Sequence, residues 1–155
     1  MDSAEARGRL AESRIAHLAT VDETGRPHLV PMVFVVAGET IYSAVDAKPK
    51  SSRSLRRLAN VRVHPAVAVL VDHYDDSDWT ALWWARADGT ARVLEVGGSA
   101  TEESGSAIDA LVRRYAQYRA QPPEGPVLAI DVERWSGWAA TTGPDPIAPT
   151  EDAGV

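Results

Sequence analysis

The chain has 155 residues, of which 45% are apolar, and a formal net charge of −6 at pH 7. This length fits one compact domain and is too short for two domains of typical size. The sequence contains no cysteine, which excludes disulfides, thiolate metal sites and thiol nucleophiles. The acidic balance argues against non-specific binding to nucleic acid, because such binding usually requires a basic surface.

The N-terminal residues lack the basic region and the following apolar run of a secretory signal. No apolar run approaches the roughly 18 residues that a membrane-spanning helix needs. We therefore expect a cytoplasmic protein without a membrane segment.

Strand-like segments joined by tight turns dominate the first part of the chain. Pro31 lies inside one of them and cannot donate to a sheet ladder, so it marks a bulge, an edge or backbone turned toward a ligand. A turn at Gly38 and Glu39 follows this segment. In order, the predicted elements are a helix at residues 2–12 and strands at 14–21, 27–36 and 40–45.

The rest of the chain predicts further strands and two amphipathic helices. Asp88 and Gly89 form a strong hairpin signal between two strands. The predicted elements are a helix that Ser51 or Ser52 caps, strands at 66–74, 79–87 and 90–96, a helix from about Thr101, and strands at 127–134 and 136–141. About seven strands in hairpin order predict a mainly β (α+β) fold with a small antiparallel barrel over residues 1–141. Residues 142–155 are predicted to form a disordered acidic and proline-rich tail.

A basic segment stands out in this acidic chain. Residues 47–71 contain six of the 16 Lys and Arg and none of the 22 Asp and Glu. Lys50, Ser51 and Arg53 lie where a strand gives way to a helix, and a helix N-terminus with cations beside it suits a phosphate. The alternative is that Arg53, Arg56 and Arg57 form only the solvent-exposed face of a short helix.

The aromatic residues are unusual, with five tryptophans and one phenylalanine. Trp83 and Trp84 are adjacent in a predicted strand, so they must face opposite sides of the sheet. One can fill the core, whereas the other is expected at a subunit interface or a flat ligand. The alternative is two core or interface tryptophans without ligand contact.

Motifs for metal binding and for common catalytic chemistry are missing from the sequence. The four histidines show no metal-ligand spacing with carboxylates, and the acidic loop at 75–78 lacks the glycine and glutamate of an EF-hand. The glycine pattern does not match a dinucleotide-binding fold of the Rossmann type. We therefore predict no metal, and any redox chemistry must come from a bound cofactor.

Several segments together resemble the pyridoxamine 5′-phosphate oxidase-like split β-barrel superfamily over about residues 15–141. The tryptophan segment is similar to its F420 (deazaflavin)-dependent oxidoreductase B branch. The matching segments are IAHLATV at 15–21, GRPHLVPMVF at 25–34, KPKS at 48–51, DW at 78–79 and LWWARADG at 82–89.

This resemblance implies a six- to seven-stranded antiparallel split barrel with two or three flanking helices, assembled as a homodimer with a cofactor in each of two intersubunit grooves. It implies that Lys48, Lys50, Ser51 and Arg53 hold the cofactor phosphate, and that Val30, Pro31, Met32 and Val33 lie against its tricyclic ring. Arg56 and Arg57 either meet the polyglutamate tail of F420 or face water. Trp83 or Trp84 is expected to form a wall of the neighbouring subunit's site.

The resulting prediction is an F420-dependent oxidoreductase that transfers a hydride between the deazaflavin and a planar small molecule. No side-chain base is required, and the sequence identifies no catalytic residue. Two alternatives remain: an FMN-dependent oxidase or reductase on the same fold, or a noncatalytic protein that binds F420 or haem.

Overall fold

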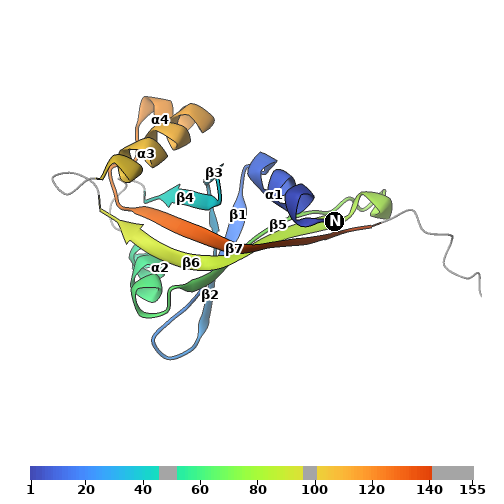
Figure 1. The fold of residues 1–155 in the computed structure, drawn as a ribbon, viewed down its shortest axis with the longest axis horizontal. Helices are drawn as coiled ribbons and strands as arrows, with labels where there is room; N and C mark the ends of the chain where they lie inside the picture. The colour runs from blue at the N-terminus through green and yellow to red at the C-terminus, as the bar shows by residue number, and fades with distance from the viewer. Residues whose placement is uncertain (46–51, 96–100, 141–155) are drawn as a thin grey trace, which may run out of the picture.

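A computed structural model describes residues 1–45, 52–95 and 101–140, and for residues 52–55 it describes the backbone alone. Seven strands form one antiparallel sheet in the order β2-β1-β5-β6-β7-β4-β3 (Figure 1). The predicted mainly β, α+β fold is confirmed. The elements are α1 (Ser3–Glu12), β1 (Ala16–Val21), β2 (Pro27–Met32), β3 (Val35–Ala37), β4 (Thr40–Ala44), α2 (Ser52–Val63), β5 (Ala66–His73), a 3-10 helix η1 (Trp79–Ala81), β6 (Trp83–Leu94), α3 (Glu102–Arg114), α4 (Ala116–Ala120) and β7 (Val127–Ala139).

Alternating apolar positions on the strands form the main core. Along β5, for example, Val67, Val69 and Val71 are buried while the residues between them are more exposed. This alternation is what a strand with one buried face requires. A second cluster, which contains Leu111 and Tyr118, joins α3 and α4 to the sheet near β4. Helices α3 and α4 therefore pack on the sheet through an apolar cluster that is separate from the main core.

The predicted hairpin at Asp88 and Gly89 is wrong. Residues 79–81 form η1, and β6 then runs without a turn from Trp83 to Leu94. Gly89 is required for close packing instead: a Cβ built there would lie 2.3 Å from the backbone oxygen of Asp131 on β7. The register of β6 against β7 shifts at Asp88 and Gly89, so the glycine accommodates a bulge between two long strands.

Two other strand predictions differ from the structure. The segment predicted as one strand at 27–36 forms β2 and β3, and the break lies at Val33 and Phe34 rather than at Pro31. Pro31 lies on β2, the first strand in the sheet order, which agrees with the predicted edge position. Conversely, the two strands predicted at 127–134 and 136–141 form the single strand β7. The predicted tail at 142–155 lies outside the described residues.

A network of charged side chains attaches α3 to the sheet. Arg92 on β6 donates to Glu103 of α3 at 2.6 and 2.8 Å and to Asp131 of β7 at 2.7 and 3.1 Å. The Tyr42 hydroxyl donates to Glu103 at 2.9 Å. These hydrogen bonds from Arg92 hold the pKa of Glu103 and that of Asp131 below their ordinary values of 4.5 and 3.8. The network thus favours both carboxylates in their charged form.

Replacing Arg92 by methionine is expected to remove a pH-dependent part of the stability. Both folded-state pKa values lie below the unfolded ones, so the stabilisation is fully present above about pH 4.5 and is lost as pH falls through the folded pKa values. Because all three side chains are partly exposed, we expect Arg92→Met to cost only about 1 kcal/mol of unfolding free energy near neutral pH. Urea unfolding near neutral pH and at about pH 3 measures this cost. An equal cost at both values would contradict the assignment.

Candidate functional site

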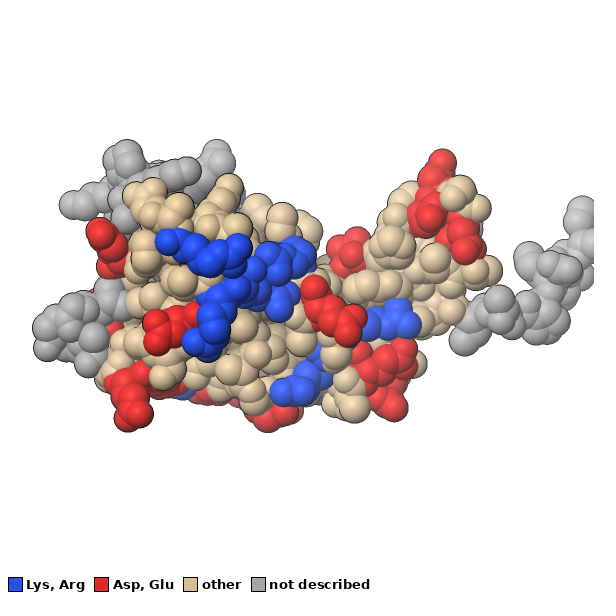
Figure 2. Space-filling view, turned by 90° about the horizontal axis from the view of Figure 1, so that it is seen from above, with Lys and Arg blue, Asp and Glu red and all other residues tan. Residues whose placement is uncertain are grey.

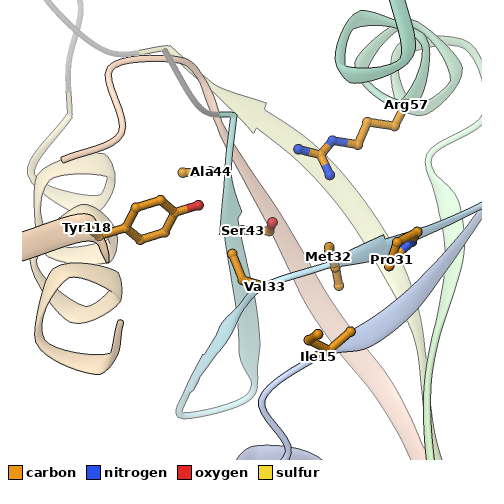
Figure 3. A pocket seen from close by; sticks show the side chains of 8 residues that line it. All are labelled: Ile15, Pro31, Met32, Val33, Ser43, Ala44, Arg57 and Tyr118. Carbon is orange, nitrogen blue, oxygen red and sulfur yellow. The ribbon is translucent and has the colours of Figure 1, made fainter. Parts of the chain in front are cut away.

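A pocket of about 360 Å³ lies between α2, α4 and the ends of β2 and β4 (Figure 3). This volume falls within the roughly 300–1,000 Å³ of small-molecule sites. In Figure 3, Arg57 of α2 lies on one side and Tyr118 of α4 on the other, with the strand residues between them. The lining residues are Ile15, Pro31, Met32, Val33, Ser43, Ala44, Arg57 and Tyr118.

The break between β2 and β3 shapes the apolar wall of this pocket. Tyr115, at the junction of α3 and α4, accepts a hydrogen bond from the Phe34 N–H at 3.0 Å. Its hydroxyl lies 2.8 Å from the Phe34 carbonyl and 2.9 Å from that of Arg14, and donates to one of them. These bonds satisfy backbone groups that leave the sheet ladder. The chain can therefore turn at Val33 and present Pro31, Met32 and Val33 to the pocket.

Ser43 contributes a buried hydroxyl to the pocket wall. Its side chain is 2% exposed, and its Oγ has no hydrogen-bond partner among the described residues. A buried hydroxyl without a partner costs about 1–3 kcal/mol, which a ligand atom at hydrogen-bonding distance would recover. Ser43 is not among the site residues predicted from the sequence. The available signal was its alternation with Ile41, which places a hydroxyl at a core-facing position of β4.

Arg57 and Arg56 lie on different sides of α2. Arg57 is half-buried and extends into the pocket. Arg56 is exposed and lines a separate hollow beside Asp22 and Glu23. The solvent-face interpretation of the helix therefore describes Arg56, whereas Arg57 lines the pocket.

The predicted cofactor residues fall into three groups. Pro31, Met32, Val33 and Arg57 line the pocket together. Val30 does not line this pocket; it is partly buried and packs against the main core cluster, to which Met32 also belongs. Lys48, Lys50 and Ser51 lie outside the described residues, and for Arg53 the structure gives the helical backbone only.

Trp83 and Trp84 face opposite sides of β6, as the sequence predicts. The Trp83 ring stacks on His73 with centroids 6.1 Å apart, and the Arg9 guanidinium lies 5.0 Å from the centroid of its indole. Trp84 lines a hollow of about 720 Å³ on the other face, together with Leu29. Neither tryptophan lines the pocket of its own chain, and the prediction that Trp83 or Trp84 forms a wall of the neighbouring subunit's site stays a prediction.

Neither a metal site nor a membrane-spanning helix is found in the described residues. They contain no group of three or more His, Cys, Asp or Glu side chains arranged to hold a metal ion. Within the same ranges, no helix has the length and apolar character needed to cross a membrane.

Comparison with solved structures places the chain among proteins of the same fold at low sequence identity. Protein Rv2991 from Mycobacterium tuberculosis is 20% identical with a TM-score of 0.71, over 97% of this chain and 94% of that one. An FAD-binding protein from Mesorhizobium loti is 19% identical with a TM-score of 0.67, over 88% and 94%. HutZ, a haem storage protein from Vibrio cholerae, is 20% identical with a TM-score of 0.65, over 90% and 95%. These similarities support the fold alone.

No curated protein matches this chain. A family model does match: the one described as pyridoxamine 5′-phosphate oxidase covers residues 3–139. This range includes every element from α1 to β7 and every residue that lines the pocket. The chain therefore belongs to the pyridoxamine 5′-phosphate oxidase family.

Proposed function

We propose that the protein is an oxidoreductase that binds coenzyme F420, with FMN as the alternative, in the pocket between α2, β2, β4 and α4. The observation that carries this proposal is the buried Ser43 hydroxyl, which has no hydrogen-bond partner among the described residues and lies in the same pocket as the Arg57 side chain. A flat cofactor with polar ring atoms and a phosphate requires this combination of an apolar wall, a hydrogen-bonding group and a cation.

The residues that line the pocket have different roles in cofactor binding. Pro31, Met32 and Val33 exclude water from one face of the ring. The Ser43 hydroxyl donates to or accepts from one polar atom of the cofactor, and Arg57 offsets its negative charge. The chemistry that the bound cofactor supplies is hydride transfer to or from a planar small molecule stacked on the ring. The chain then contributes orientation and a water-poor site rather than a side-chain base.

The choice of F420 rests on the resemblance of the tryptophan segment to the F420-dependent branch. The basic segment, with Lys48, Lys50, Ser51 and Arg53, suits the phosphate of either cofactor. The structural similarity to an FAD-binding protein favours a flavin-type ring without distinguishing the two. Titrating the purified protein separately with F420 and FMN, with fluorescence quenching as the signal, decides between them. We expect F420 to bind more tightly, and binding of neither would contradict the proposal.

An enzymatic function must be distinguished from a carrier function, because one protein of the same fold is a haem storage protein. No histidine lines the pocket among the described residues, which disfavours haem with a histidine axial ligand there. We expect the bound, reduced cofactor to be reoxidised repeatedly when an electron-poor acceptor is added. Single stoichiometric binding without any acceptor-dependent turnover, across a broad acceptor screen, would favour a carrier.

Replacing Ser43 by alanine is expected to affect cofactor binding and stability in opposite directions. The free energy of unfolding of the unliganded protein should stay equal or rise, because the change removes a buried hydroxyl that has no partner among the described residues. Cofactor affinity should fall about fivefold to tenfold, which corresponds to one hydrogen bond of about 1 kcal/mol. Thermal unfolding without cofactor and the fluorescence titration measure the two effects. Unchanged affinity would remove Ser43 from the site.

We also propose that two subunits associate through the sheet face that carries Trp84, so that both chains contribute to each site. Leu29 on this face is 66% exposed, and Trp138, paired with Trp84 across β6 and β7, is 49% exposed. Exposed apolar surface of this kind usually marks an interface. The substitution Leu29→Asp should convert a dimer into a monomer in light scattering. Val63→Asp, at another exposed apolar residue, is the matched control and should leave the dimer intact.

A further inference from the structure

Three arginines, Arg14, Arg114 and Arg119, lie near Tyr115 and the end of α3. The guanidinium carbons of Arg14 and Arg114 lie 4.6 and 5.7 Å from the centroid of the Tyr115 ring. Arg14 donates to the Arg114 carbonyl at 2.8 Å, and Arg114 donates to the Ser13 carbonyl. Arg119 donates to the carbonyl of Arg113 at 3.2 Å. We call Arg14, Arg114 and Arg119 the arginine cluster.

Positive charge is concentrated on the face that carries this cluster. Figure 2 looks onto the side of α1, α3 and α4 and shows a patch of Lys and Arg side chains near its middle, with acidic side chains at the edges of the patch and smaller basic groups beside it. Elsewhere in the described ranges, arginines such as Arg7, Arg62 and Arg134 form ion pairs with carboxylates. No carboxylate of the described residues lies within 4 Å of a cluster guanidinium to form such a pair. In an acidic chain, this concentration of uncompensated charge favours an anionic ligand.

Stabilisation of the C-terminus of α3 explains only part of the positive charge in the arginine cluster. Cations near a helix C-terminus interact favourably with its dipole, which amounts to about half an elementary charge. Three guanidinium groups carry far more charge than this. Each has five N–H donors, and the bonds to the carbonyls of Ser13, Arg113 and Arg114 and to the Tyr115 hydroxyl use four donors in all. The cluster therefore retains donors in the planar arrangement that carboxylates accept.

The arginine cluster adjoins the pocket through two lining residues. Ile15, which is 59% exposed, directly follows Arg14 in the chain. Tyr118 lies between Tyr115 and Arg119, and its N–H donates to the Tyr115 carbonyl at 3.1 Å. Ile15 and Tyr118 lie on the part of the pocket away from Arg57 in Figure 3. A molecule could thus place an apolar ring in the pocket and an anionic group over the cluster.

We propose that the arginine cluster binds the carboxylate of a flat, apolar ligand whose ring stacks on the cofactor at the Ile15 and Tyr118 end of the pocket, which identifies the substrate class as aromatic carboxylates. This assignment rests on the proposed function, because the ligand is the planar partner of the cofactor. It divides the charged groups between two ends of one site. Arg57 acts on the cofactor at the α2 end, and the cluster acts on the substrate at the α3–α4 end.

The test compares two probes of equal shape, 2-naphthoate and the neutral 2-naphthamide, by isothermal titration calorimetry on the full chain. It is carried out both without cofactor and with F420 or FMN at saturation. Naphthoate should bind on the order of tenfold more tightly than naphthamide, as expected for a charge-assisted contact. The double variant Arg14→Gln and Arg119→Gln should lose this preference while its affinity for naphthamide stays unchanged. The control, Arg26→Gln, makes one equivalent charge change on the exposed β1–β2 turn and should keep the preference.

Three results would overturn the assignment: equal affinity for the two probes, a preference that survives in the double variant, or a preference lost in Arg26→Gln. A preference lost in Arg57→Ala but kept in the double variant would place the carboxylate at the α2 end and would also overturn it. We expect the double variant to fold, because both replaced side chains are exposed. Thermal unfolding of the double variant checks this. Failure of the proposed function is seen separately, as binding of neither F420 nor FMN.

Discussion

Replacing Arg57 by alanine is expected to weaken cofactor binding about tenfold to a hundredfold. A hydrogen bond to a charged group contributes about 1.5–3 kcal/mol, and each 1.4 kcal/mol is a factor of ten in affinity. The Arg57 side chain is half-buried in the pocket, so solvent screens its charge less than that of an exposed arginine. The dissociation constants of the wild-type protein and the variant for the preferred cofactor measure this effect.

Arg56→Ala is the matched control, because it removes one positive charge from the residue directly before Arg57 in the same helix. Arg56 lines the hollow beside Asp22 rather than the pocket, so its loss should change cofactor affinity less than about twofold. Comparing F420 with a form cut back to its phosphate tests the alternative interpretation of Arg57 as a tail-binding residue. Equal losses for both forms agree with a contact inside the pocket. Equal affinity of the wild type and Arg57→Ala would contradict it.

Replacing Gly89 by alanine is expected to destabilise the protein by about 3 kcal/mol. The added Cβ would lie 2.3 Å from the backbone oxygen of Asp131, and neither of the long paired strands can move without disturbing its ladder. Gly8→Ala provides the control with the opposite sign. Nothing lies within 4 Å of a Cβ at Gly8, which is inside α1, so alanine should stabilise that helix by about 0.5–1 kcal/mol.

Urea unfolding of Gly89→Ala and Gly8→Ala under the same conditions measures both changes in the free energy of unfolding. If Gly89→Ala were as stable as the wild type, the close approach of β6 to β7 would be wrong. A hairpin turn at Asp88 and Gly89 would then regain support.

Much of the fold follows from local patterns in the sequence. The alternation of Val67, Val69 and Val71 marks a strand with one buried face, and Thr101 marks the start of α3 by capping it. The predicted number of strands agrees with the structure partly by compensation, because one segment divided into two strands while other pairs merged. Asp88-Gly89 illustrates why: the same dipeptide suits a tight turn or a close contact between strands, and only the tertiary position of Asp131 distinguishes them.

In the candidate site too, some residues could be identified from the local sequence, whereas others required the tertiary structure. Pro31 could be identified because a residue without an N–H is unusual inside a strand. Ser43 and Tyr118 could not be assigned from sequence in the same way, since each reaches the pocket through packing of segments far apart in the chain. Arg57 could be separated from Arg56 only when the orientation of α2 against the strands was known.

The central claim is that the pocket lined by Pro31, Met32, Val33, Ser43 and Arg57 holds a flavin-type cofactor. A crystal structure of the protein with F420 or FMN tests it most directly. We expect the ring to contact Met32 and Val33, with a polar atom within hydrogen-bonding distance of the Ser43 hydroxyl and Arg57 beside the cofactor's negative charge. A cofactor bound instead in the hollow beside Trp84, or beside Arg9 and Trp83, would contradict it.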